Sequence, residues 1–257
     1  MPPTSHVAIE EVTALCKRLR LKYVREQLEE VVLTARAQRW DPAEMLRVLF
    51  NAEAEGRDRA TITVKRRRAH LPVGKSFDTW DSRRSSIPEK TQKALASLEW
   101  ISRSENLAIA GPSGLGKSHM LEALANRAID AGHSVAWFSI EDLGALVRRH
   151  RVDDTVAKAF SGLASLSLAV VDDIGLMPIS ADAAEGLYRL VDAAYERRSV
   201  AISSNLHPSG FEQLMDKTIA SALVDRLLHH AHVILVEGES VRLADATSGK
   251  GVVPLVS

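Results

Sequence analysis

The segment GPSGLGKS, residues 111–118, constrains this chain more than any other feature. It fits the pattern G-x-x-x-x-G-K-[ST], with strand-like residues before it and helix-like residues after it. Such a loop needs glycines where the backbone folds around phosphate oxygens, a lysine that reaches the β- and γ-phosphates, and a hydroxyl that holds Mg²⁺. A glycine-rich turn without a ligand would not need all three. We therefore predict that a nucleoside triphosphate binds Gly111, Pro112, Ser113, Gly114, Leu115, Gly116, Lys117 and Ser118.

A second element, LAVVDDIG at residues 168–175, is typical of a buried strand that ends in two carboxylates. We expect Asp172 to face Mg²⁺, together with Ser118, and Asp173 to polarise the attacking water as general base. The structural alternative is a helix N-cap after a buried strand. A Glu is more usual at the second position, so a chain that uses ATP only to assemble, with almost no hydrolysis, stays open.

Two more polar residues are candidates for phosphoryl transfer. Asn205 ends the run SVAISSN, where its amide can orient the attacking water or touch the γ-phosphate. The alternative is an Asn that caps the turn before Pro208. Arg226 lies in ASALVDRLLHHAH, from which it cannot easily reach its own nucleotide, although it can reach a neighbour's as an arginine finger. The alternative there is a surface ion pair with Asp225.

From residue 105 onward, short apolar runs alternate with helical patterns, as βαβ units require. The predicted fold class is α/β, with a parallel sheet flanked by helices. Candidate strands are 107–111, 134–140, 167–173, 199–205 and 232–238, and a helix is expected at 181–198. The phosphate loop then lies at the carboxyl end of a strand, where open α/β sheets bind ligands.

The residues before this sheet predict a small all-α module. Apolar positions recur at three- and four-residue spacing between residues 12 and 35, and Asp41 as N-cap with Pro42 at the first helical position begins another helix. Three or four short helices should result. The predicted domains are a helical module at 1–70 that binds DNA or a partner, a basic linker at 71–104 and the ATPase domain at 105–257.

Charge is distributed unevenly, although the net charge is zero. Residues 1–104 carry 20 Lys and Arg against 14 Asp and Glu, whereas residues 105–257 carry 13 against 19. The basic residues Lys65, Arg66, Arg67 and Arg68 favour a surface that contacts a nucleic-acid backbone. The alternative is a solvated helix face.

Cysteine and histidine usage limits the other classes of site. Cys16 is the only cysteine, which excludes an internal disulfide and fits a reducing cytoplasm. His229, His230 and His232 lack cysteine partners at zinc-ligand spacing, and we expect them to end a helix. No apolar run reaches the ~18 residues that a membrane span needs, and no secretory signal begins the chain. The prediction is a cytoplasmic protein with no membrane partner.

Taken together, GPSGLGKS, LAVVDDIG, SSN followed by HP, and VDRLLHHAHVILVEGESVRL resemble the IstB-like helper ATPases of bacterial insertion sequences, relatives of the DnaC-type helicase loaders. The resemblance spans most of the chain, including the exit KRRRAHLPVGKSFDTWD of the helical module. It implies an AAA+ fold without a C-terminal lid, ATP-driven homo-oligomers on double-stranded DNA, and a partner transposase that the helper activates or targets. A helicase loader is the alternative function.

The same resemblance assigns roles by position. It makes 111–118 the phosphate loop, Asp172 and Asp173 the metal and base carboxylates, Asn205 the sensor and Arg226 the trans-acting finger. It also implies DNA contact for Arg148, Arg149 and Arg151, which a solvated helix C-terminus explains nearly as well. Arg242 follows Val241, where the family often has tyrosine, so the resemblance assigns it only weakly. A small-molecule kinase would need a lid and an acceptor pocket but no basic module.

Overall fold

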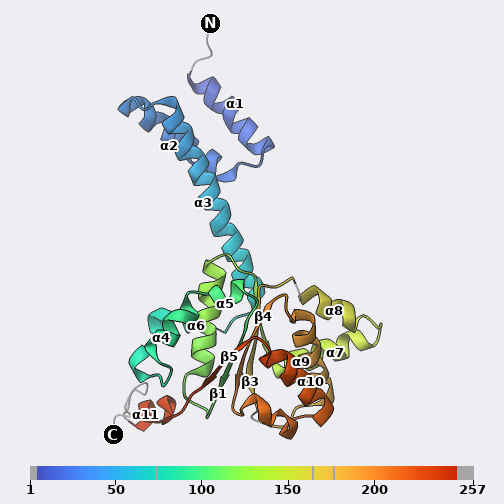
Figure 1. Cartoon of the computed structure of the whole chain (residues 1–257). Coiled ribbons are helices and arrows are strands. Elements are labelled where there is room, and N and C mark those ends of the chain that lie inside the picture. Colours follow the sequence, from blue (N-terminus) through green and yellow to red (C-terminus); the bar gives the residue numbers. More distant parts are fainter. Residues whose placement is uncertain (1–4, 73, 164, 176, 248–257) are drawn as a thin grey trace, which may run out of the picture. The chain divides into compact units, whose positions relative to one another are not determined.

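The computed structural model describes residues 5–72, 74–163, 165–175 and 177–247 (Figure 1). The chain divides into two compact units, Met1–Val64 and Lys65–Ser257, which are called here the N-terminal and C-terminal units. Within the described residues, no helix is both long and apolar enough to span a membrane.

Helices build the N-terminal unit, as the apolar spacing predicts. They are α1 (Ser5–Arg18), α2 (Lys22–Gln38) and α3 (Pro42–Ala69), the last of which crosses into the C-terminal unit. Asp41 Oδ1 accepts a hydrogen bond from the Ala43 N–H at 2.8 Å, which confirms the predicted cap. The buried core contains Cys16, Val24, Leu28, Val31 and Leu49. The third helix is longer than expected, because no proline interrupts it after Pro42.

A buried carboxylate joins α2 to α3. Glu53 Oε2 accepts hydrogen bonds from the backbone N–H groups of Tyr23 and Val24, at 2.8 and 3.0 Å. These donors lie in the first turn of α2, whose N-cap Leu21 offers no side-chain acceptor. Burial acts to raise the pKa of Glu53, but the bonds from Val24, Arg57 and Tyr23 outweigh it, so this pKa lies below its ordinary value.

We expect Glu53→Ala to destabilise the N-terminal unit by about 1–2 kcal/mol, since it removes a side-chain acceptor from the first turn of α2 and leaves two backbone donors unpaired. Thermal unfolding followed by circular dichroism measures this. A carboxylate with a lowered pKa stabilises the fold at neutral pH and stops doing so on acidification, so the deficit should shrink as pH falls through the folded pKa of Glu53. The control is Glu55→Ala, which removes an exposed carboxylate of the same helix, paired with Arg59 at 3.5 Å. Equal losses in both variants would contradict the capping role.

Five parallel strands form the sheet of the C-terminal unit, in the order β2-β3-β4-β1-β5. They are β1 (Asn106–Ala110), β2 (Val135–Ser139), β3 (Leu168–Ile174), β4 (Ser199–Ser204) and β5 (Ala231–Leu235). The predicted α/β class and parallel sheet are confirmed, and the strands differ from the expected ranges only near their ends. The predicted helix at 181–198 ends at Ala194.

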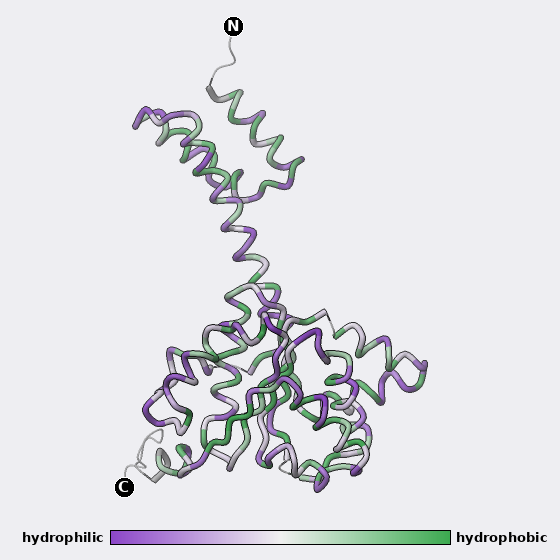
Figure 2. The backbone as a smooth tube through the Cα atoms, in the orientation of Figure 1, coloured by the Kyte–Doolittle hydropathy of each residue, from purple (hydrophilic) through white to green (hydrophobic). Residues whose placement is uncertain are grey.

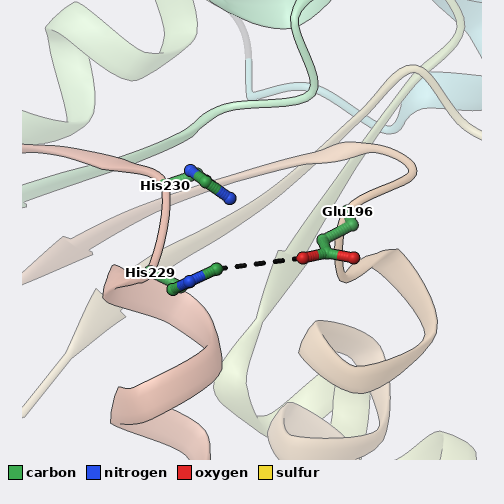
Figure 3. A group of neighbouring side chains, drawn as sticks. All are labelled: Glu196, His229 and His230. Carbon is green, nitrogen blue, oxygen red and sulfur yellow. Dashed lines mark ion pairs between the residues drawn. The ribbon is translucent and has the colours of Figure 1, made fainter.

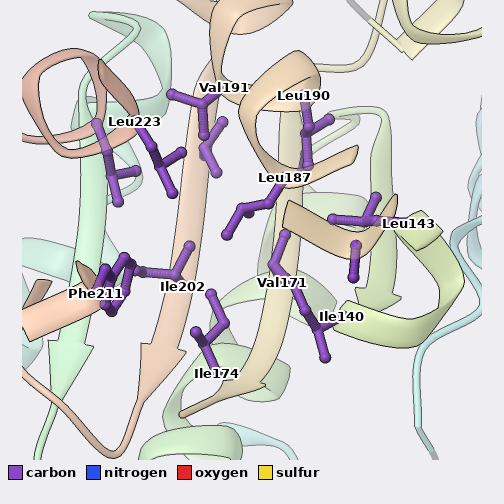
Figure 4. Packing of buried hydrophobic residues seen from close by; sticks show 14 of the residues in the cluster. Ile140, Leu143, Val171, Ile174, Leu187, Leu190, Val191, Ile202, Phe211 and Leu223 are labelled. Atoms are coloured by element: carbon purple, nitrogen blue, oxygen red, sulfur yellow. The ribbon is translucent and has the colours of Figure 1, made fainter. Parts of the chain in front are cut away.

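Helices cover both faces of this sheet (Figure 1). On one face lie α4 (Glu89–Ala96) and α6 (Lys117–Asp130); on the other lie α7 (Ile140–Arg151), α8 (Val156–Leu163), α9 (Ala181–Ala194) and α10 (Lys217–Leu228). Figure 4 shows Val171 and Ile202 of the sheet packed against Leu143, Leu187 and Leu223 of the helices. Figure 2 shows the strands as hydrophobic segments, whereas hydrophobic and hydrophilic residues alternate along the helices, as in amphipathic helices.

Residues 71–104, for which the sequence predicts a basic linker, contain regular structure. They include η1 (Phe77–Thr79), η2 (Ser82–Arg84), α4 and α5 (Glu99–Ser102). Glu122 of α6 accepts a hydrogen bond from the Lys75 N–H at 2.9 Å, and Asn126 donates to the Lys75 carbonyl at 3.1 Å. This segment therefore packs against α6 within the C-terminal unit. The predicted domain limits at residues 70 and 104 stay a prediction. After β4 come η3 (Pro208–Gln213) and α10, and α11 (Val241–Thr247) follows β5.

Candidate functional site

The loop 111–118 connects the carboxyl end of β1 to the first turn of α6, as predicted. Two glycines make its path possible. Gly111 has φ 148°, and a Cβ there would collide with the backbone oxygen of Val236; Gly114 has φ 85° and would collide with Ser240. Glycine at these two positions therefore lets the loop pass close to Val236 and Ser240 as it leads into the helix N-terminus, whose free N–H groups can bind anionic oxygens.

Lys117, the first residue of α6, is buried at 5% exposure and points back into the loop. Its Nζ donates to the carbonyls of Gly111 and Pro112, at 2.7 and 2.8 Å, and to Asn205 Oδ1 at 2.8 Å. Burial lowers the pKa of the Lys117 ammonium, the nearby carboxylates of Asp173 and Asp172 oppose that change, and Arg242 adds to it. A buried cation with carboxylates close by is a marked feature of ligand sites.

The two carboxylates predicted at the end of β3 lie where the β3–β4 ladder changes register, between Val171 and Ile174. Asp172 Oδ1 accepts a hydrogen bond from the Ser203 hydroxyl, and the same hydroxyl accepts one from the Asp173 N–H at 2.8 Å. Asp173 has φ 64°, a conformation that an ordinary strand residue does not adopt. The strand therefore bends at the point where its carboxylates reach the sheet edge.

Asn205 follows β4 and links three parts of the site. Its Oδ1 accepts from Lys117 and from the Ser113 hydroxyl, the latter at 3.3 Å, and its Nδ2 donates to Asp173 Oδ1 at 3.4 Å. The structure thus brings Lys117, Asp173 and Asn205 together from α6, β3 and the end of β4. This is the placement that phosphoryl-transfer chemistry needs, although the role of each residue stays a prediction.

A cavity of about 510 Å³ opens beside the loop. Its walls include Ser113 to His119, Asp173, the segment around Trp80, and Val241 with Arg242. The Trp80 ring lies 3.1 Å from the Cβ position of Gly116, packs edge-on against His119, and donates through Nε1 to Gln92 at 2.8 Å. The nearby segment also contributes Lys75, Thr79, Asp81, Arg84 and Ser85.

Sequence reasoning missed Trp80 and Arg84 as site residues. The sequence does show an aromatic residue, Trp80, after the basic stretch. The resemblance explains it as part of the junction after the helical module and does not indicate that it lines a pocket. Arg242, assigned only weakly from sequence, lines the same cavity and acts electrostatically on Lys117.

Arg226 does not line this cavity. It lies on α10, where its Nε is 3.0 Å from Asp192 Oδ1 of α9 and its guanidinium is 5.4 Å from the centre of the Tyr188 ring. The expected alternative partner, Asp225, is therefore wrong: the ion pair that the structure shows is with Asp192. Residues one apart on a helix point in different directions, whereas Asp192 faces Arg226 across the contact between α9 and α10.

The basic residues predicted to contact DNA differ in how they are engaged. Arg66 contacts Asn126 and Asp130, and Lys65 contacts the Gly132 carbonyl. Arg148 and Arg151 pair with Asp182 at 3.6 and 2.7 Å, and Arg151 also pairs with Glu185 at 2.7 Å. Within the described residues, Arg67, Arg68 and Arg149 are exposed, and their side chains make no hydrogen bond or ion pair.

Comparisons with known proteins agree with this architecture. The model of the family described as IstB-like ATP binding protein matches residues 14–248. A protein of Pseudomonas aeruginosa described as an ATP-binding protein of insertion sequence IS21 is 29% identical over 242 residues, covering 92% of this chain and 90% of that one. An insertion sequence ATP-binding protein of Sinorhizobium fredii is 32% identical over 204 residues, covering 77% and 81%.

Solved structures share the fold of the sheet domain. The AMPPCP-bound DnaA of Aquifex aeolicus has a TM-score of 0.53 at 18% identity, covering 70% of this chain and 56% of that one. The structure titled DnaI has a TM-score of 0.51 at 16% identity, covering 63% and 91%. These likenesses show the AAA+ fold.

Proposed function

From the premise that this chain belongs to the family of IstB-like ATP binding proteins, we propose that it is a Mg²⁺-dependent ATPase that forms oligomers on duplex DNA and assists a partner transposase. The observation that carries the proposal is the meeting of Lys117, Asp173 and Asn205 beside a glycine-rich loop. The cavity beside this loop, about 510 Å³ in volume, is within the usual range for cofactor sites.

ATP would bind with its phosphates along the loop and its base towards Trp80. Lys117 would exchange its backbone and amide acceptors for the β- and γ-phosphate oxygens. The flat ring of Trp80 beside Gly116 offers a stacking surface, and Arg84 and Arg242 add positive charge to the same cavity. The γ-phosphate would then lie near Asp173 and Asn205.

The oxygens of Ser118 and Asp172 suit Mg²⁺, which takes oxygen ligands and keeps several waters. Ser203 fixes the Asp172 carboxylate from one side, which leaves its remaining lone pairs for a hydrated ion. Bound Mg²⁺ would supply positive charge at the β- and γ-phosphates. We propose that Ser118 and Asp172 hold this ion at the carboxyl edge of the sheet.

Hydrolysis would use Asp173 and Asn205. Asp173 would accept a proton from the attacking water as general base, and Asn205, which contacts both Asp173 and Lys117, would orient that water against the γ-phosphate. Arg226 would act on the nucleotide of a neighbouring subunit, because in its own chain it does not line the cavity.

Duplex DNA would be held through backbone phosphates by Arg67, Arg68 and Arg149. These side chains show no internal partner among the described residues, so binding would cost no ion pair. Lys65, Arg66, Arg148 and Arg151 would have to leave a present contact first. We therefore propose them as weaker contributors.

The DNA proposal is tested by Arg67→Ala/Arg68→Ala. Affinity for unrelated duplexes should fall alike, and the slope of log K against log salt should become shallower by roughly 1.8, about 0.9 for each phosphate that is no longer neutralised. A control that removes the same charge is Lys22→Ala/Arg25→Ala, on exposed positions of α2. Fluorescence anisotropy at several salt concentrations measures both variants, and equal changes in the two would contradict a local DNA surface.

Assistance of a transposase is tested by strand transfer in vitro. ATP and this chain should stimulate integration by the proposed partner transposase, and the Arg67→Ala/Arg68→Ala variant should stimulate it less. A helicase loader would instead deliver a replicative helicase to single-stranded DNA and leave integration unchanged.

A further inference from the structure

A separate group of polar side chains lies at the opposite edge of the sheet from the phosphate loop. Glu196 lies between α9 and β4, and His230 directly precedes β5. Because β4 and β5 flank β1 in a parallel sheet, their amino-terminal ends meet at one edge, whereas the phosphate loop follows the carboxyl end of β1. This group is therefore distinct from the nucleotide site.

Glu196, His229 and His230 form the group, and each offers a ligand atom within 4.8 Å of those of the other two (Figure 3). His229 Nδ1 is 4.0 Å from Glu196 Oε1, and the two imidazole rings have centres 4.1 Å apart. His229 is the C-cap of α10, which confirms the expectation that it ends a helix, whereas His232 belongs to β5 and bonds Glu105 at 2.7 Å. The spacing of residues along the chain gave no sign that Glu196 lies beside these histidines.

The backbone that carries these side chains is held by one buried residue, Asn106. Its N–H donates to the His230 carbonyl at 2.7 Å, its Nδ2 donates to the Leu227 carbonyl at 2.9 Å, and its Oδ1 accepts from the Val200 N–H at 2.9 Å. The start of β4 and the junction between α10 and β5 are thus tied together beside β1. Glu196 itself has φ 56°, in the left-handed region that residues other than glycine seldom adopt.

We propose that Glu196, His229 and His230 bind Zn²⁺ or a similar transition-metal ion. Two imidazoles and one carboxylate are a ligand set that suits zinc and leaves a position for water, whereas Mg²⁺ and Ca²⁺ prefer oxygen ligands alone. Zinc–ligand bonds of about 2.0–2.1 Å place tetrahedral ligand atoms roughly 3.4 Å apart, so the ligand atoms, now within 4.8 Å of one another, must draw together by up to about 1.4 Å. All three are exposed and can do so by rotation while the backbone stays fixed.

One side chain beside the group competes with the metal. The Tyr195 hydroxyl lies 3.0 Å from His229 Nδ1. A metal at Nδ1 would displace this bond, and a metal at the other ring nitrogen would keep it as an outer support that orients the ring. Either arrangement leaves His230 and Glu196 as ligands, so these two residues give the sharpest test.

The experiment uses the full chain without a histidine tag, after removal of metals with EDTA and in the absence of nucleotide. Zn²⁺ is titrated by calorimetry and by competition with a chromophoric chelator, and Co²⁺ gives a visible spectrum that reports tetrahedral ligation. We expect one equivalent of zinc, with affinity lowered at least ~10-fold by His230→Ala and by Glu196→Gln. The control, His207→Ala, removes a histidine that bonds Ser209 and should leave the affinity unchanged.

Circular dichroism of each variant checks that it is folded. Zinc affinity that is absent in the parent chain, that survives both His230→Ala and Glu196→Gln, or that His207→Ala reduces as strongly would overturn the proposal. Because nucleotide is absent and the ligands lie at the other sheet edge, failure here would leave the ATPase proposal standing.

Discussion

Lys117→Ala protein should lose ATP binding almost completely while keeping its fold. The ammonium makes two or more charge-assisted contacts with phosphate oxygens in the proposed complex, and their removal should cost about 3 kcal/mol or more, roughly a 100-fold rise in Kd. Isothermal titration with ATP and Mg²⁺ measures the change. The matched control is Lys90→Ala, which removes an exposed lysine of α4 in the same unit.

Asp173→Asn separates binding from turnover at the same site. The substituted side chain keeps its size and can still contact Asn205, but it cannot accept a proton from water, so ATP affinity should persist while phosphate release falls by about 100-fold or more. Unchanged ATP affinity in Lys117→Ala, or abolished affinity in Asp173→Asn, would show that these roles are misassigned.

Arg226→Ala protein should bind ATP normally and hydrolyse it poorly, with turnover reduced roughly 1000-fold, because a finger acts chiefly on transition-state charge. Neither this variant nor Lys117→Ala should turn over alone. Their equimolar mixture should regain DNA-stimulated phosphate release, since a Lys117→Ala neighbour still supplies Arg226 to a subunit whose own phosphate loop is intact.

The ion pair with Asp192 offers a control for a purely structural role of Arg226. Asp192→Asn removes the carboxylate 3.0 Å from Arg226 and leaves the guanidinium in place. If Arg226 only braces α10 against α9, Asp192→Asn should lose as much activity as Arg226→Ala, and the mixture should be no more active than its parts. After co-assembly has been confirmed, that pair of results would refute the trans role.

The features that the sequence predicted are those that depend on residues close together in the chain. The loop 111–118 and the strand with Asp172 and Asp173 depend on neighbouring residues, so their patterns indicated both structure and chemistry. The apolar runs were sufficient for a parallel sheet, because strands buried on both faces are nearly continuous in hydrophobicity.

What the sequence did not show depends on contacts between distant segments. Trp80 reaches the phosphate loop only because its segment folds onto α6, and Asp192 meets Arg226 only because α9 packs on α10. Adjacent Asp225 looked like the simpler partner. Glu196 joins His229 and His230 only because β4 and β5 lie on either side of β1. None of these pairings has a spacing that could be read from the chain.

The change of register in β3 distinguishes two carboxylates that are chemically alike and adjacent. Asp172 accepts a hydrogen bond from Ser203, whose side chain is fully buried within β4, so this carboxylate is held from inside the sheet. Asp173 is exposed and bonds the Asn205 amide, which lies beyond the end of the strand. Both residues belong to β3, but the carboxylate of Asp172 bonds a buried hydroxyl within the sheet, whereas that of Asp173 bonds an amide beyond the strand end. Two adjacent carboxylates in the chain therefore differ in what holds them, one a buried strand and the other a loop residue.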